Sequence, residues 1–275
     1  MKLCVIPIIL IIFLACGDNF DKKSKLAGLR ILAISANTPE INSAGTVLLT
    51  PLISYVNGAS ANLNYTWEAC PDPGIDFGAN VSCDNSSAAL KLSGAGTFSI
   101  ATLAATHNTG NATTLSVAVP AAAFTYLATL NSKTKFNGLD YMVILKYIDQ
   151  ASGVNSTAIK MIKLSTKTSA QLNTNPTTGN IQFKGADLTS YPSSEGDMSV
   201  SNLSSSENYD LDTDIGIQTK SENMFVSWYS STGKFLFNRS KFGEKNTFTP
   251  DGNTGVFVII YRDSRGGVTS NLTSF

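Results

Sequence analysis

Cys16 is the residue whose type and setting point most directly to a chemical modification. It follows Lys2, an apolar run over residues 5–14 and the small residue Ala15. This order is typical of a bacterial lipoprotein signal peptide, in which the cysteine becomes the lipid-bearing N-terminus. An ordinary secretory signal with a coincidental cysteine is the alternative interpretation. We predict lipidation of Cys16, which would anchor the protein at a membrane.

The apolar run itself is too short to be a membrane-spanning helix. It covers about ten residues, whereas a helix needs roughly 20 to cross a bilayer, and Pro7 lies within it. Residues 16–25 are polar and carry both signs of charge, which predicts a lipidated tether. We therefore expect a signal peptide over residues 1–15. We also expect a protein that is lipid-anchored in the bacterial cell envelope, at the outer membrane, facing the periplasm or the surface.

Cys70 and Cys83 are the thiols that remain for the body of the protein, because Cys4 leaves with the signal and Cys16 carries the lipid. Export takes the chain through an oxidising compartment, where such a pair forms a disulfide. Metal ligation is the alternative, but a zinc site needs further Cys or His ligands, and His107 is the only histidine. We predict a disulfide between Cys70 and Cys83.

The other residues with catalytic or metal-binding potential form weaker patterns. His107 lies in a polar segment, residues 106–110, that is typical of an exposed turn and offers a general base no supporting site. Asp210, Asp212 and Asp214 alternate as in a calcium loop, but the glycine and glutamate that such a loop requires are displaced. A looser calcium site and a solvated acidic loop are both open interpretations.

Charge and composition exclude one class of partner and permit a sizeable fold. The chain has 20 Lys+Arg and 20 Asp+Glu, so the net charge is zero. Charged residues make up 15% of the chain, below the usual figure of about 25%. Without a basic stripe, the sequence has no electrostatic footprint for nucleic acid. The 43% apolar content is enough for cores, and the length suits two domains.

Short segments of alternating apolar and polar residues dominate the body of the chain. Examples are residues 29–33, 46–50 and 62–67, each bounded by Gly, Asn, Ser or Pro. This period of two predicts strands, and many short strands favour a sandwich or a barrel. Pro120, followed by the alanine-rich residues 121–128, instead predicts a short helix between two strands.

An internal repeat is the strongest indication of how the chain is organised. Residues 147–156 and 261–270 both read Tyr-x-Asp-x-x-x-Gly-Val-x-Ser, and both follow an apolar strand. Upstream, each half has one tryptophan in an alternating segment, Trp67 in the first and Trp228 in the second. Two copies of one sandwich explain why these matches occur in the same order.

The same motifs resemble those of a known family. A strand-borne tryptophan followed by Tyr-x-Val-x-Leu-x-Tyr-x-Asp-x-x-x-Gly over residues 141–153 resembles bacterial immunoglobulin-like and PKD-like sandwiches. Residues 29–33, then Pro39 and Gly45, lead to that tryptophan and to a cysteine-bearing loop. This opening is similar to that of uncharacterised envelope lipoproteins of spirochaetal, predatory and gliding bacteria. The resemblance implies a structural framework.

We therefore expect an all-β fold of two tandem immunoglobulin-like β-sandwiches, with a short crossover helix in the first. Domain 1 is expected over residues 26–166 and domain 2 over residues 167–275. One tryptophan and one tyrosine should mark each core, because a tryptophan on an inner strand usually plugs such a sandwich. These core markers are Trp67, Trp228, Tyr147 and Tyr261. A carbohydrate-binding platform is the alternative role for the tryptophans.

Function is less constrained than fold, because one sandwich architecture serves many functions. We expect a non-catalytic protein-binding or adhesion module that contacts a membrane through its lipid and has a protein partner. A structural spacer or subunit of an envelope complex is the alternative, and a calcium- or carbohydrate-binding module is a further one. We expect no enzymatic activity and no cofactor.

Overall fold

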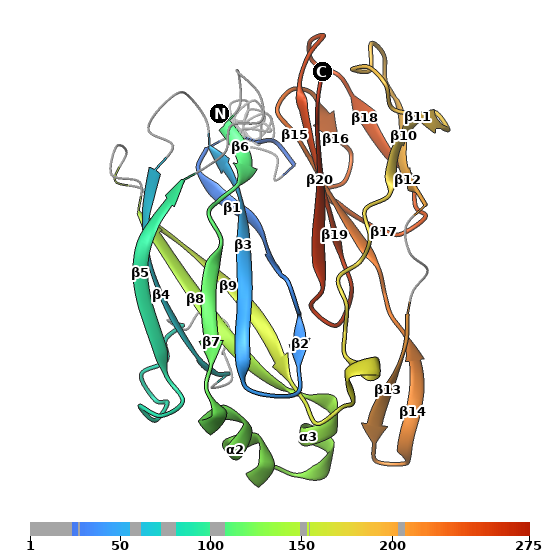
Figure 1. Ribbon diagram of the computed structural model, residues 1–275. Coiled ribbons are helices and arrows are strands. Elements are labelled where there is room, and N and C mark those ends of the chain that lie inside the picture. The colour runs from blue at the N-terminus through green and yellow to red at the C-terminus, as the bar shows by residue number, and fades with distance from the viewer. Residues whose placement is uncertain are drawn as a thin grey trace, which may run out of the picture.

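The computed structural model describes residues 24–26, 28–55, 62–72, 81–99, 108–148, 153, 155–202 and 207–275. The predicted signal peptide, Cys16 and His107 lie outside these ranges, so those predictions stay predictions. In the described residues the fold is an all-β sandwich architecture, with two sandwiches lying side by side (Figure 1).

The first sandwich is built from two sheets. The central strand of one sheet is β3 (Gly45–Tyr55). It pairs antiparallel with β1 (Arg30–Ala36), β6 (Asn108–Asn111) and β7 (Leu115–Val119). The facing sheet has the strand order β2 (Glu40–Ile41), β9 (Asn155–Leu164), β8 (Leu139–Ile148), β4 (Asn62–Pro71) and β5 (Leu92–Ser99). This separation of consecutive strands between two sheets is typical of immunoglobulin-like sandwiches.

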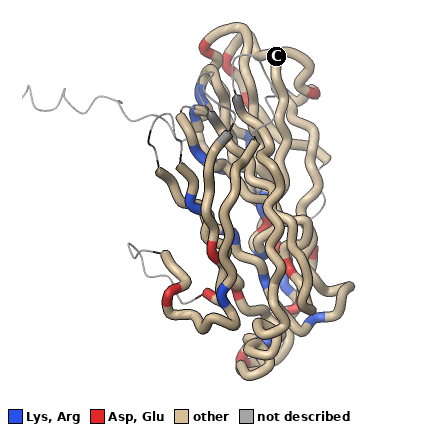
Figure 2. The backbone as a smooth tube through the Cα atoms, turned by 60° about the vertical axis from the view of Figure 1, so that its left-hand side comes forward, with Lys and Arg blue, Asp and Glu red and all other residues tan. Residues whose placement is uncertain are grey.

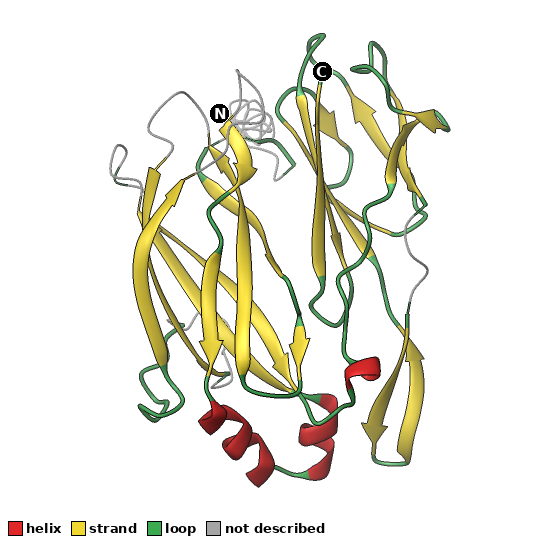
Figure 3. Cartoon of the chain, viewed as in Figure 1, coloured by secondary structure: helices red, strands yellow, loops and turns green. Residues whose placement is uncertain are grey.

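The predicted crossover helix is present as α2 (Ala121–Thr129), which begins directly after Pro120. A second short helix, α3 (Ser132–Asn137), follows it and was not predicted. Its N-terminus is capped by Asn131, whose side-chain oxygen accepts a hydrogen bond from the Thr134 N–H at 2.8 Å. Both helices lie at one end of the first sandwich (Figure 3).

The second sandwich begins after the single turn η1 (Ser169–Gln171). One sheet has the order β11 (Ala186–Asp187), β10 (Asn180–Phe183), β12 (Gly196–Ser201), β18 (Asn246–Thr249) and β16 (Lys234–Phe235). The other has the order β17 (Arg239–Lys241), β15 (Phe225–Ser230), β19 (Val256–Arg262) and β20 (Val268–Ser274). A separate hairpin, β13 (Asn208–Thr213) and β14 (Gly216–Ser221), extends beyond these sheets.

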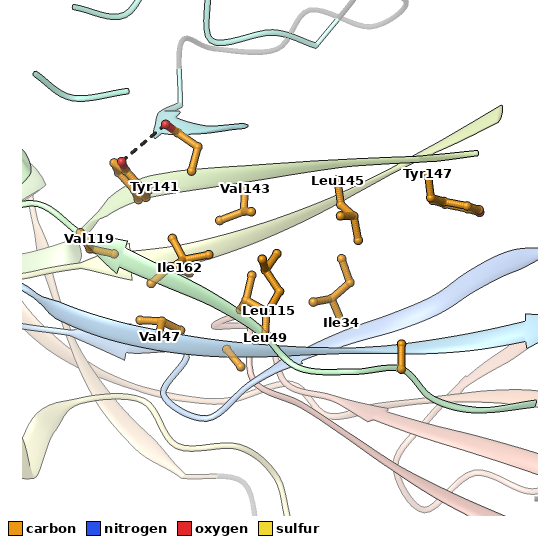
Figure 4. Close-up of a cluster of buried hydrophobic side chains, with 14 of the residues drawn as sticks. Ile34, Val47, Leu49, Leu115, Val119, Tyr141, Val143, Leu145, Tyr147 and Ile162 are labelled. Carbon is orange, nitrogen blue, oxygen red and sulfur yellow. Dashed lines mark hydrogen bonds between the residues drawn. The ribbon is translucent and has the colours of Figure 1, made fainter. Parts of the chain in front are cut away.

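Each sandwich has its own core. Figure 4 shows that Val143 and Leu145 of β8 point toward Val47 and Leu49 of β3, which closes the first core. In the second, aromatic rings dominate and contact one another at centroid distances from 4.9 to 6.2 Å. These rings are Tyr191, Trp228, Phe235, Phe248, Phe257 and Phe275.

The internal repeat corresponds to equivalent places in the two sandwiches. Trp67 pairs with Leu145 between β4 and β8, as Trp228 pairs with Ile259 between β15 and β19. Tyr147 and Tyr261 are both buried, and their hydroxyls bind main chain at the start of their sandwich. The Tyr147 oxygen accepts from the Ile31 N–H at 3.2 Å, and the Tyr261 hydroxyl donates to the Gly179 carbonyl at 3.2 Å.

The two tryptophans differ in burial. Trp228 is 0% exposed, and its ring N–H donates to the Ser240 hydroxyl at 2.9 Å. Trp67 is only half-buried, because it lies over Gly94 of the edge strand β5. A Cβ added to Gly94 would lie 2.5 Å from the Trp67 ring nitrogen. Equivalent register therefore does not give equivalent environments.

A third apolar cluster joins the two sandwiches. β19 is buried on both faces, because its alternate residues Phe257, Ile259 and Tyr261 enter the second core. The residues between them face the first sandwich. The cluster consists of Leu26, Leu32, Ala33, Leu52, Val256, Val258, Ile260 and Val268. Burial on both faces explains why β19 is a continuous apolar run rather than an alternating one.

The first described residues are held by the second sandwich. Lys25 forms a parallel bridge with Ser230, the last residue of β15. The Leu26 N–H donates to the Ser230 carbonyl at 2.8 Å, and the Ser230 N–H donates to the Ser24 carbonyl at 2.9 Å. The N-terminal segment therefore reaches the second sandwich before the first one begins.

Replacing the tryptophans with alanine should separate their roles. Trp228→Ala should lower the free energy of unfolding by about 3–5 kcal/mol, because it empties a fully buried site. Trp67→Ala should cost less than half as much, since part of that ring is already in water. Urea denaturation followed by circular dichroism measures both losses. Equal losses would contradict the difference in burial.

Candidate functional site

The predicted disulfide is present and covers part of a sheet. Cys70 and Cys83 are bonded, and both are buried with Met142 and Ile144 on the face of β8 that points away from the core. The disulfide therefore covers apolar residues of β8 on this face, together with Val81 and Met161. Glu68, beside it on β4, pairs with Lys91 at 3.3 Å and with Lys146 at 3.3 Å.

The acidic run lies on β13 and the turn that follows it, where two of its carboxylates have partners. Asp210 accepts from the Thr219 hydroxyl at 2.9 Å, and Asp214 pairs with Lys133 of α3. Across the part of the chain that the structure describes, no group of three or more His, Cys, Asp or Glu side chains is placed to hold a metal ion. The structure therefore does not bring the side chains of Asp210, Asp212 and Asp214 together as one carboxylate group.

The feature that the sequence analysis missed is a buried polar cluster between the sandwiches, centred on Arg265. Its guanidinium Nη2 lies 2.7 Å from Glu40 Oε2, and Nη1 lies 3.2 Å from Glu222 Oε1. Nη2 also donates to the Gln171 carbonyl at 3.2 Å, and the guanidinium lies 5.0 Å from the centre of the Tyr209 ring. One side chain thus contacts β2, the connection between the sandwiches and the hairpin.

Asp263 sets the position of Arg265 through the turn between β19 and β20. Its Oδ1 accepts from the N–H groups of Arg265 at 2.7 Å and Gly267 at 2.8 Å. Gly267 has no room for a side chain, because an added Cβ would contact Asp263 and would lie 2.8 Å from the Thr174 carbonyl. The Asp-x-x-x-Gly part of the repeat therefore has a structural role in the second sandwich.

Two lysines complete the cluster, Lys160 from β9 of the first sandwich and Lys167 from the connection between the sandwiches. Lys160 donates to the Gly266 carbonyl at 2.6 Å, and Lys167 lies 3.5 Å from Glu40. Burial lowers the pKa of Lys160 to about 8, although the Asp263 carboxylate opposes that shift. Burial also lowers the pKa of Lys167, against the attraction of Glu40. Lys160 therefore binds an acceptor of the second sandwich, whereas Lys167 pairs with Glu40 of β2 in the first.

The two glutamates respond to this setting in opposite directions. Burial would raise the pKa of Glu40, but the Ser165 hydroxyl, the charge of Lys167 and the hydrogen bonds from the Asn173 N–H and Arg265 outweigh it and lower that pKa. Burial and then the Asp263 charge raise the pKa of Glu222 from its ordinary 4.5 to about 7. Glu222 is thus the member of the cluster whose ionisation costs most near neutral pH.

A comparison of the two repeat copies contains a signal for this cluster. Arg265 occupies the place that Ala151 holds in the first copy, and Gly266 precedes the shared glycine. A long charged side chain in one copy alone indicates a contact that the other copy lacks. Glu40 and Glu222 carry no comparable signal, because their burial depends on how the sandwiches pack.

A second contact between the sandwiches lies farther along the hairpin. The Asn137 side chain of α3 donates to the Asp212 carbonyl at 2.8 Å and accepts from the Asp212 N–H at 2.7 Å. The Asn137 amide thus makes the two main-chain hydrogen bonds that a neighbouring strand would otherwise make with Asp212 of β13. The turn beyond it leaves Ile215 82% and Ile217 63% exposed. We call α2, α3 and the β13–β14 hairpin the distal end, since Ser24–Leu26 lie at the opposite end of the molecule (Figure 1).

Charge is distributed without a dominant patch. Figure 2 shows Lys and Arg interspersed with Asp and Glu along the tube, in keeping with the zero net charge. No helix in the described ranges is both long enough and apolar enough to cross a bilayer. No protein-family model matches the chain, and no curated protein matches its sequence.

Removing the central cation should destabilise the protein strongly. Arg265→Ala removes the cation that pairs with Glu222 and one of the two cations beside Glu40, and breaking a buried pair in this way costs about 3–5 kcal/mol. Arg239→Ala is the matched control, because Arg239 is exposed and stacks on Phe225 outside the Arg265 cluster. Urea midpoints compare the two variants. A loss as small for Arg265→Ala as for the control would show that the Arg265 cluster does not hold the sandwiches together.

Glu222 should make stability depend on pH in a defined window. A carboxyl group whose pKa is raised on folding binds its proton more tightly when folded, so its contribution is present below pH 4.5 and is lost as pH rises to about 7. Glu222→Gln keeps an acceptor for Arg265 but has no proton to release, so its free energy of unfolding should not fall over this pH range. The variant should gain about 1–3 kcal/mol over wild type between these pH values. Parallel slopes of unfolding free energy against pH would contradict the assignment.

Proposed function

We propose that the protein is a lipid-anchored, non-catalytic protein-binding or adhesion module of the bacterial cell envelope, and that its distal end contacts the partner. One observation carries this proposal. The hairpin from the second sandwich crosses to α3 of the first, is held there by Asn137, and exposes Ile215 and Ile217 at its tip. Two aliphatic residues on a braced projection are a suitable anchor for a protein interface.

The position of the N-terminal segment supports a distal end that points away from the membrane. The chain from Cys16 to Ser24 spans at most about 28 Å when fully extended. Because Ser24–Leu26 pair with Ser230, a lipid on Cys16 would keep that end near the bilayer. The distal end would then project away from the membrane, where a partner can reach it.

The arrangement of the sandwiches supports a binding module rather than a structural spacer. An end-to-end tandem would give the greatest reach from a membrane, whereas these sandwiches lie side by side (Figure 1). What the arrangement provides is a surface with contributions from both halves, namely α2 and α3 from the first and the hairpin from the second. The buried cluster around Arg265 keeps that surface in one geometry.

Substitutions at the hairpin tip test this proposal. Ile215→Ser with Ile217→Ser removes the apolar anchor from two exposed positions, so folding should be unaffected. After cross-linking in native envelopes, wild type should yield a stoichiometric cross-linked protein, and the double variant should yield at least tenfold less. Thr219→Ser, on the same hairpin, is the control and should behave as wild type. Equal yields from the double variant and wild type would refute a distal binding site.

A further inference from the structure

The edge strand β5 lacks the usual protection against pairing with another strand. Its residues, Leu92–Ser99, include no charge and no proline, and its register with β4 is continuous over the whole strand. Natural edge strands are usually short, charged, bulged or covered. Among the described residues, no strand pairs with its outer edge. β17, by contrast, is an edge of three residues that includes Arg239 and Lys241.

Hydrogen bonds at the end of β5 show which of its main-chain groups point outward. The Ser99 carbonyl accepts from the Thr113 N–H at 3.1 Å, and the Ser99 N–H donates to the Thr113 hydroxyl at 3.0 Å. Ser99 therefore directs its main chain away from β4. Because this direction alternates along an antiparallel strand, Ser93, Ala95 and Thr97 direct theirs outward as well.

We propose that β5 pairs antiparallel with β5 of a second copy of this chain, about a two-fold axis at Ala95. The three outward-directed residues are symmetric about Ala95, so this register satisfies all of them. Ser93 lies opposite Thr97 of the second copy, Ala95 opposite Ala95, and Thr97 opposite Ser93. Each opposed pair exchanges two N–H···O bonds. Further extension is blocked, because Thr113 already occupies the main chain of Ser99.

The side chains are self-complementary in the same register. On the core-facing side, Gly94 meets Gly96 of the second copy, and Leu92 meets Phe98. The Trp67 and Tyr65 rings lie over the two glycines, where an added Cβ would be 2.5 Å from Trp67 and 2.6 Å from Tyr65. Both rings are half-buried, so pairing would cover them. On the other side, small uncharged residues meet, so no like charges oppose association.

Antiparallel pairing would also invert one copy relative to the other. β5 runs along the long axis of the first sandwich (Figure 3). The two N-terminal segments would therefore point in opposite directions. Copies anchored in two facing membranes can pair in this way, whereas two upright copies in one membrane cannot. The inferred contact is a bridge between membranes, and it goes beyond the distal binding site proposed above.

Charge reversal across the two-fold axis tests both the contact and its register. Full-length lipidated protein is reconstituted into phosphatidylcholine vesicles, and dynamic light scattering measures vesicle clustering. Wild type should cluster vesicles. Ser93→Lys with Thr97→Lys opposes lysines across the axis and should reduce clustering at least tenfold. Ser93→Lys with Thr97→Glu opposes lysine and glutamate and should restore it to within about twofold of wild type.

Matched controls separate this contact from other causes of clustering. Asn155→Lys with Thr157→Lys adds the same charge to exposed positions of β9 and should cluster as wild type. Ile215→Ser with Ile217→Ser should also cluster as wild type, and loss there would assign clustering to the distal end. No clustering by wild type, or no rescue by the lysine–glutamate variant, would overturn the proposal. Unchanged thermal melting confirms that each variant is folded.

Discussion

The ion pairs of Arg265 with Glu40 and Glu222 are the interaction on which the arrangement of the molecule depends. The guanidinium lies where β2, the connection, the hairpin and the β19–β20 turn meet. Removing charges from water is costly, so such a cluster persists only when every member has partners. The apolar cluster beside it supplies favourable burial that does not depend on direction, and the ion pairs fix the geometry. Together they make two sandwiches behave as one body.

Much of the fold could be predicted because its signals are local. Alternation predicts the strands, Pro120 and the alanine run predict α2, and the tyrosine motif predicts two similar sandwiches. The equivalent hydroxyl contacts of the two tyrosines were found only in the structure. The disulfide follows from a cysteine count and an expected compartment. Each of these inferences uses residues close together in sequence or a pattern that occurs twice.

The Arg265 cluster and the apolar cluster between the sandwiches could not be predicted, because their members are far apart in sequence and differ between the two repeat copies. Glu40 and Arg265 become neighbours only when the sandwiches pack side by side. The even-numbered residues of β19 gave no sign that they face another sandwich, since an apolar run is equally typical of any buried strand. The half-burial of Trp67 likewise depends on Gly94 in a neighbouring strand. A repeat predicts which strand positions are equivalent, but it does not predict which residues of other strands surround them.

The bridge between Lys25 and Ser230 decides how a pulling force would travel through the protein. Tension on a lipid-bearing N-terminus would enter at Ser24–Leu26 and pass to β15 of the second sandwich through the Ser230 hydrogen bonds. It would reach the first sandwich at the same time through β1. The load would therefore be shared by the two halves in parallel, so that neither has to unravel before the other resists. Sharing the load in this way would raise the force needed to unfold the protein when it is pulled between its N-terminus and its distal end.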